Sequence, residues 1–133
     1  MITTKEVLSK YKKIALVGAS RDEKKTSTIV MKYLQMHGYK VFPVNPSMSG
    51  QKILGETVFG KLSEIDDEIE IVDVFRPSEE VIEIAKEAVK VGAKVLWLQL
   101  NISNLEAKKI VEENKIIYID DKCTKIEFEK YLN

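Results

Sequence analysis

The stretch that decides the fold is residues 13–21, which read Lys-Ile-Ala-Leu-Val-Gly-Ala-Ser-Arg. The first five residues form a short apolar run, which predicts a buried strand of a parallel sheet. The run stops at Gly18, which permits a tight turn, and the small Ala19 and Ser20 let a ligand approach the backbone. A helical pattern follows, so free N–H groups at its start predict a place for a phosphate group. Only the first glycine of a G-x-G-x-x-G pattern is present, and the alternative is a glycine turn without a ligand.

The same alternation of strand and helix continues along the chain. Further apolar runs predict strands at residues 40–44, 70–75, 94–98 and 115–119. Helical spacing predicts helices at residues 27–37, 78–91, 103–113 and 124–132, with a long loop at 46–60 and a short helix at 61–65. Strands alternating with helices predict an α/β fold: a doubly wound sheet of five mainly parallel strands with helices on both faces. Residues 1–133 are expected to form a single domain.

Local signals predict how these elements begin and end. Thr26 or Ser27 is expected to cap the first of these helices, and Ser78 the second. Residues 103–106, Ser-Asn-Leu-Glu, have the spacing of a capping box, which places the next helix start at Ser103. Pro43 lacks an N–H group, so the strand at 40–44 is expected either to lie at an edge of the sheet or to be locally unpaired at this position.

Composition excludes several classes of protein. Lys plus Arg and Asp plus Glu each number 21, so the formal net charge is zero. This balance argues against nucleic acid or an anionic membrane surface as a partner. No apolar run is long enough to span a membrane, and the charged residues 1–13 do not resemble a signal peptide. A single cysteine fits a reducing cytoplasm, and one cysteine with one histidine gives no metal-ligand set. The histidine, His37, is expected at a helix end and not in catalysis.

Ligands of doubly wound folds bind beyond the carboxyl ends of the strands, and basic residues gather there. The two arginines, Arg21 and Arg76, each directly follow a predicted strand end, whereas the remaining basic residues are nineteen lysines. Arginine presents a rigid fork of donors that suits phosphate. Lys24, Lys25 and Lys52 lie in loops at the same edge. A ligand with several phosphates would explain this clustering, and the alternative is ordinary solvated charge.

Other residues at the strand ends are polar or aromatic. A nicotinamide-dinucleotide enzyme usually has an acidic residue after the second strand, where this chain has Asn45 and Pro46. This counts against NAD but not against adenine nucleotides in general, and the pair could also be only a turn. Phe75 belongs either to the core or beside an adenine, and Pro77 keeps the preceding arginine extended. Gln99, at the end of the fourth strand, is expected to make a polar contact.

Cys123 follows the fifth predicted strand and so falls at the same edge of the sheet. A helix N-terminus and Lys122 would lower the pKa of its thiol, while Asp120 and Asp121 would raise it. Two interpretations stay open: inert packing, and a redox thiol.

Taken together, these residues make the chain resemble the small single-domain CoA-binding proteins, which are similar to the CoA-binding domain of the succinyl-CoA synthetase alpha subunit. The resemblance covers nearly the whole chain and is carried by residues 14–21, 37–46, 50–55, 72–77, 97–100 and 121–123. The chain departs from the family's pattern at Asn101, where glycine is frequent, and after Cys123, where relatives often have a histidine. Both departures concern the thiol end of the ligand.

The resemblance implies a Rossmann-like domain that binds coenzyme A. It implies that the pyrophosphate contacts Gly18, Ala19 and Ser20. The adenosine part would lie beside Asn45, Pro46 and Lys52. The opposite wall of the site would be lined by Phe75, Arg76 and Pro77. It brings no catalytic residues, because the histidine phosphorylated in the synthetase lies in another domain. A valine at Gly18 is expected to abolish binding with modest damage to folding.

The expected function is therefore a non-catalytic or regulatory module that binds coenzyme A or an acyl-CoA as a small-molecule ligand. One alternative is an enzyme, either an NAD(P)-type oxidoreductase or a CoA transferase-like fragment. Another is a protein-interaction subunit that has lost its ligand. A homodimer is expected on general grounds alone.

Overall fold

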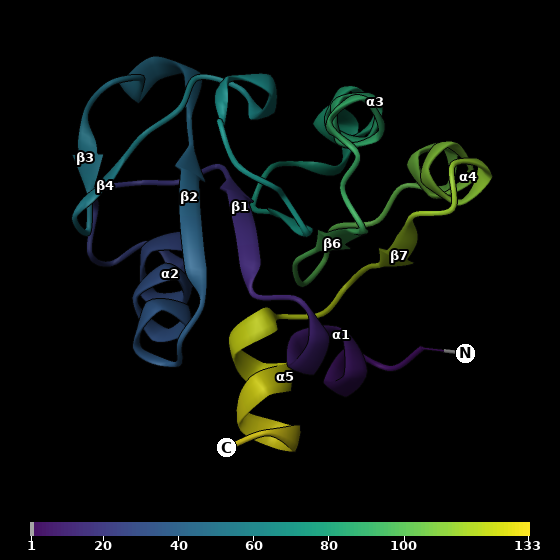
Figure 1. The fold of residues 1–133 in the computed structure, drawn as a ribbon, viewed down its shortest axis with the longest axis horizontal. Coiled ribbons are helices and arrows are strands. Elements are labelled where there is room, and N and C mark those ends of the chain that lie inside the picture. The colour runs from purple at the N-terminus through teal and green to yellow at the C-terminus, as the bar shows by residue number, and fades with distance from the viewer. Residues whose placement is uncertain (1) are drawn as a thin grey trace.

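The computed structural model describes residues 2–133, which form a five-stranded parallel sheet covered by helices on both faces (Figure 1). The sheet order is β2-β1-β5-β6-β7. The strands are β1 (Lys13–Val17), β2 (Lys40–Val44), β5 (Ile71–Val74), β6 (Val95–Leu98) and β7 (Ile117–Ile119). The predicted α/β fold class is confirmed: β1 and β2 have the predicted bounds, and β5, β6 and β7 are one or two residues shorter than predicted.

The helices divide between two layers. One face carries α1 (Thr4–Lys10), α2 (Thr26–Met36) and α5 (Thr124–Tyr131), and the other carries α3 (Val81–Val91) and α4 (Leu105–Glu113). From β1 the chain passes through α2 to β2, and it then crosses back to enter β5 on the other side of β1. The reversal lies between β1 and β5. This is the switch point where such sheets bind ligands.

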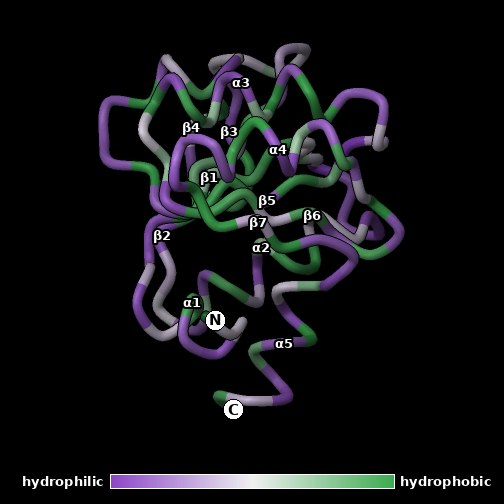
Figure 2. The backbone as a smooth tube through the Cα atoms, turned by 90° about the vertical axis from the view of Figure 1, so that its right-hand side faces the viewer, coloured by the Kyte–Doolittle hydropathy of each residue, from purple (hydrophilic) through white to green (hydrophobic). Residues whose placement is uncertain are grey.

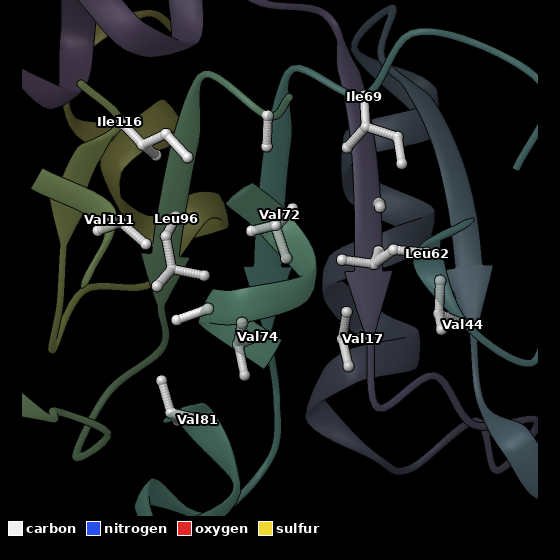
Figure 3. Packing of buried hydrophobic residues seen from close by; sticks show 14 of the residues in the cluster. Val17, Val44, Leu62, Ile69, Val72, Val74, Val81, Leu96, Val111 and Ile116 are labelled. Carbon is white, nitrogen blue, oxygen red and sulfur yellow. The ribbon is translucent and has the colours of Figure 1, made fainter. Parts of the chain in front are cut away.

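Each face of the sheet has its own apolar core, because neighbouring residues of a strand point to opposite faces. Val17, Val44, Val72, Val74 and Leu96 pack beneath α3 and α4 (Figure 3). Ile14, Leu16, Ile71 and Trp97 face α1, α2 and α5. Hydrophobic segments accordingly concentrate in the sheet, between the two helical layers (Figure 2).

The segment predicted as a long loop contains short regular elements. A 3₁₀ turn (Pro46–Met48) leads into an antiparallel hairpin of β3 (Lys52–Ile53) and β4 (Glu56–Thr57). After the hairpin the chain runs beside β2, where the N–H of Phe59 donates to Pro43 O and the N–H of Asn45 donates to Phe59 O, both at 2.9 Å. Strand β2 is the edge of the main sheet, as Pro43 predicts.

Three predicted helix caps differ in the structure. Lys25 is the N-cap of α2 and makes no side-chain cap, while Thr28 Oγ1 donates to Ser20 O at 2.7 Å. Ser78 begins a 3₁₀ turn (Ser78–Glu80), and α3 starts only at Val81. Asn104, not Ser103, caps α4, since its side chain accepts from the N–H of Ala107.

The sequence pattern missed α1, which has only seven residues. Thr3 and Glu6 form a reciprocal capping box at its start. Its Val7 and Leu8 are fully buried in the same core as α2 and α5. This helix therefore completes one layer of the fold.

Candidate functional site

Two clefts lie at the switch point and share three lining residues, and we call the two together the groove. The first, which we call the α3 cleft, has a volume of about 450 Å³ and is lined by Val17, Gly18, Val44, Asn45, Pro46, Ser47, Gly60, Lys61, Arg76, Glu80, Ile84 and Glu87. The second, the α2 cleft, has a volume of about 340 Å³ and is lined by Gly18, Ala19, Ser20, Lys25, Thr26, Ser27, Asn45, Phe75 and Arg76. Gly18, Asn45 and Arg76 border both clefts. A larger hollow of about 650 Å³ is lined only by residues 2–10 and gathers no side chains from other elements.

Gly18 turns the chain at the centre of this groove. Its φ is +96°, and a Cβ atom there would lie 2.6 Å from Phe75 O and 3.0 Å from Arg76 Cδ. Its N–H donates to Val44 O at 3.0 Å, so the turn is held against β2 on one side and pressed on β5 on the other. The expectation of only modest damage from a side chain here is therefore wrong, because the clash is with main-chain atoms.

Asn45 fastens this turn to the loop after β2. Its Nδ2 donates to Ala19 O at 2.9 Å, and its Oδ1 accepts from the N–H and Oγ of Ser47 at 2.9 and 2.8 Å. Both ends of the Asn45 amide therefore bond to the protein, and Pro46 lines the α3 cleft next to it. The structure shows the turn, and the pair lines the α3 cleft; contact of Asn45 and Pro46 with a ligand stays a prediction.

The α2 cleft has the character of an anion site. Within residues 2–133, the N–H groups of Thr26 and Ser27 have no acceptor in the protein, and Lys25 supplies no side-chain cap. Free N–H groups and the helix dipole favour a negative ligand at this end of α2. Lys25 adds a cation at the rim.

Arg76 lies between the two clefts and is paired. Its Nε donates to Glu80 Oε1 at 3.0 Å and its Nη2 to Glu80 Oε2 at 2.7 Å. This pair raises the pKa of Arg76 and lowers the pKa of Glu80. The sequence singled out the arginine and missed its partner, although spacing of four residues across a helix start was a usable signal.

The remaining predicted residues divide between the groove and its surroundings. Phe75 is half-buried and lines the α2 cleft. Arg21, Lys52 and Pro77 do not border either cleft. The α3 cleft instead takes Lys61, Ile84 and Glu87, which approach from the crossover segment and from α3. These residues are distant in sequence from the strand ends, so the strand-end rule did not find them.

Comparison with known families assigns most of the chain to one family. Residues 12–129 match the family described as "CoA binding domain". The chain belongs to this family. The recognition made from the sequence is therefore confirmed, and the groove lies wholly within the matched residues.

Relatives of this CoA-binding domain include proteins of the same size and one much larger enzyme. The Bacillus subtilis protein called "Uncharacterized protein YneT" is 39% identical over 122 residues, which cover 92% of this chain and 89% of that protein. A solved structure of a hypothetical protein from Pyrococcus horikoshii OT3 has 41% identity and a TM-score of 0.93, covering 99% of this chain and 94% of that one. An ADP-forming acetate–CoA ligase of Methanocaldococcus jannaschii is 29% identical over 87 residues, 65% of this chain but 12% of the ligase.

Gln99 is buried in this CoA-binding domain and borders neither cleft. Its Nε2 donates to Asp73 Oδ1 at 2.6 Å, and Thr124 Oγ1 donates to Asp73 Oδ2 at 3.0 Å. Asp73 is fully buried, and burial raises its pKa to about 7. The sequence missed Asp73, although a lone acidic residue inside an apolar strand run was a signal for such a cluster.

Cys123 packs in the core on the α2 face. It is 6% exposed and shares that core with Trp97 and Phe128. Burial is the main cause that raises the pKa of its thiol. Raised pKa and low exposure both disfavour thiolate chemistry, so the structure favours the packing interpretation. A redox role for Cys123 stays a prediction, which mass spectrometry of the folded protein incubated with CoA disulfide would test.

Neither a membrane-spanning helix nor a metal-ligand cluster is found among the described residues. Within residues 2–133, no helix is long and apolar enough to cross a membrane, and no group of three His, Cys, Asp or Glu side chains could hold a metal ion.

Proposed function

We propose that this chain binds coenzyme A or an acyl-CoA in the switch-point groove, as a module that regulates or presents the ligand without transforming it. Membership of the CoA-binding domain family supports the ligand class. The structural observation that carries the proposal is the uncapped start of α2, which opens on the turn at Gly18 between Lys25 and Arg76. This arrangement suits a ligand with a pyrophosphate.

The two clefts correspond to two parts of such a ligand. The pyrophosphate would lie in the α2 cleft, against the backbone of residues 18–20 and the N–H groups of Thr26 and Ser27. The adenosine part would lie in the α3 cleft, between Pro46 and Ile84. Lys61 borders this cleft and is a better placed cation for the 3′-phosphate than Lys52, which lies on the hairpin.

The position of the histidine supports a role without catalysis. His37 Nδ1 lies 2.7 Å from Tyr33 O, and its ring stacks on Tyr33 at the far end of α2 from the groove. Neither His37 nor Cys123 borders either cleft. The groove residues named here therefore bind and orient, and we assign none of them a chemical step.

A thermal shift comparison of CoA, dephospho-CoA, NAD and ATP tests the ligand class. A ligand at 100 times its Kd adds about 2.7 kcal/mol to stability. We expect CoA to stabilise the protein more than NAD, and dephospho-CoA to bind about tenfold more weakly, because one charge-assisted contact is lost. NAD is included because Glu80 and Glu87 give the α3 cleft carboxylates that can accept hydrogen bonds from its ribose hydroxyls. Stabilisation by NAD and not by CoA would overturn the proposal.

Two neighbouring lysines provide a matched test of the α2 cleft. Lys25 borders this cleft and Lys24 does not, and both are exposed. We expect Lys25→Gln to raise the Kd for CoA about three- to tenfold, in line with the loss of one partly exposed phosphate contact. Lys24→Gln should change it less than twofold. Equal effects of the two substitutions would show that only overall charge attracts the ligand.

A further inference from the structure

Arg76 is the cation common to both clefts, and it is already engaged. Its stem crosses the turn, with Cδ 3.0 Å from where a Cβ of Gly18 would lie. Its guanidinium meets both carboxylate oxygens of Glu80, which also borders the α3 cleft. The groove therefore holds an acidic group at the point where an anionic ligand would need a free arginine.

The ion pair between Arg76 and Glu80 is weak enough for a ligand phosphate to replace the carboxylate. Arginine pairs with a carboxylate and with a phosphate through the same forked geometry, so Glu80 and a ligand phosphate are alternative partners. The two side chains are 46% and 45% exposed and stand four residues apart, an arrangement whose net stabilisation is small. The stem of Arg76 lies over Gly18, a contact that does not itself involve Glu80.

The other acidic group of the cleft is committed elsewhere. Glu87 Oε1 accepts from the N–H of Leu62 at 3.2 Å and so ties the crossover segment to α3. Lys61, at the same wall, has no carboxylate partner within the described residues. Among the groove residues, Glu80 is thus the carboxylate that directly opposes a phosphate at Arg76.

We propose that Glu80 is a displaceable counter-ion that lowers the affinity of the groove for phosphate ligands: it neutralises Arg76 in the unliganded protein, and a ligand phosphate takes its place. This inference rests on the proposed function. A neutral nucleoside offers Arg76 nothing in exchange, whereas a phosphate carries enough charge to replace the carboxylate. Glu80 consequently weakens the binding of ligands whose phosphate must displace it, and it leaves a neutral nucleoside, which displaces nothing, unaffected.

Isothermal titration of CoA into wild type, Glu80→Gln and Glu83→Gln tests the inference. Glu83 is the matched control, because it lies in the first turn of α3, directly after the 3₁₀ turn that holds Glu80, and pairs with Lys86 but does not border the groove. We expect Glu80→Gln to bind CoA about two- to fivefold more tightly than wild type, which is the range that corresponds to releasing one exposed ion pair. Glu83→Gln should differ from wild type by less than about 1.5-fold.

The same substitution in an Arg76→Gln background separates this role from general electrostatics. If Glu80 acts through Arg76, its replacement there changes CoA affinity no more than Glu83→Gln does. An equal gain in that background, or unchanged or weaker binding in the single variant, would overturn the inference and leave CoA binding in place. Absence of CoA binding by the wild type would instead overturn the proposed function, and this inference with it.

Discussion

Gly18 shows how one residue joins the strands that build the groove. Its left-handed backbone turns the chain away from β1, and the absence of a side chain lets Phe75 O and the stem of Arg76 approach. Asn45 then fixes the adjoining Ala19 from the other side. The glycine is thus needed for the fold as well as for access by a ligand.

We expect Gly18→Ala to lower the free energy of unfolding by about 2–4 kcal/mol, because it adds a main-chain clash to an unfavourable backbone angle. Urea titration followed by circular dichroism measures this change. Gly50→Ala is the control: its φ is +85° and a Cβ there meets nothing within 4 Å. That variant should lose only about 1 kcal/mol. Equal losses of unfolding free energy in Gly18→Ala and Gly50→Ala would contradict this prediction, because they would show that Phe75 O moves away from the added methyl group at no cost.

The sequence predicted groove residues where they directly follow strands. Gly18, Asn45 and Arg76 were found in this way, because parallel strands bring their carboxyl ends to one edge. Lys61, Glu80 and Glu87 were missed, because their approach depends on how the crossover segment packs against α3. The resemblance predicts Lys52 beside the adenosine, whereas the hairpin of β3 and β4 holds this residue outside both clefts.

At the scale of elements, the start of α4 shows why a cap motif can be displaced by one residue. Residues Ser103 and Asn104 are both good caps, and the spacing to Glu106 favoured the serine. The structure uses Asn104, whose Oδ1 accepts from the N–H of Ala107 at 2.9 Å and whose Nδ2 donates to Ser78 O at 3.0 Å. The second bond joins α4 to the start of the α3 segment. Pairing between distant elements therefore decided between two locally equivalent residues.

Asn104→Ala should destabilise the protein by about 1–2 kcal/mol, since it removes the cap and leaves Ser78 O without this donor. Ser103→Ala should change stability by less than about 0.5 kcal/mol, because only the backbone N–H of Ser103 is used, as a donor to Ser78 Oγ. Thermal melts of the two variants decide the matter. A larger loss of stability in Ser103→Ala than in Asn104→Ala would show that Ser103 caps α4, as the sequence pattern predicts.

At the scale of the whole molecule, a buried polar cluster links the sheet to the last helix. Asp73 of β5 receives hydrogen bonds from Gln99, after β6, and from Thr124, at the start of α5. The surrounding core is apolar and includes Trp97 and Leu16. Two hydrogen bonds lower the pKa of Asp73 but do not offset burial, which raises it from 3.8 to about 7.

This shift fixes the sign of a pH dependence. An aspartate whose pKa rises on folding binds more protons in the folded state than in the unfolded state between the two pKa values. The free energy of unfolding contributed by Asp73 therefore falls as the pH rises from about 4 to about 7, and it is constant above that range. The exposed Asp67 has the opposite sign, since Lys13 lowers its pKa and its contribution is lost as the pH falls.

Asp73→Asn should remove the decline, because an amide has the shape of the carboxyl and Gln99 can turn its own amide to accept from it. We expect the loss of stability between pH 4.5 and pH 7.5 to be smaller in this variant than in the wild type, by an amount on the order of 2 kcal/mol. Urea titrations at several pH values measure it, with Asp67→Asn as the variant that keeps the decline. If Asp73→Asn instead follows the wild-type profile, then Asp73 is already ionised in the folded protein well below pH 7, and burial does not raise its pKa as described.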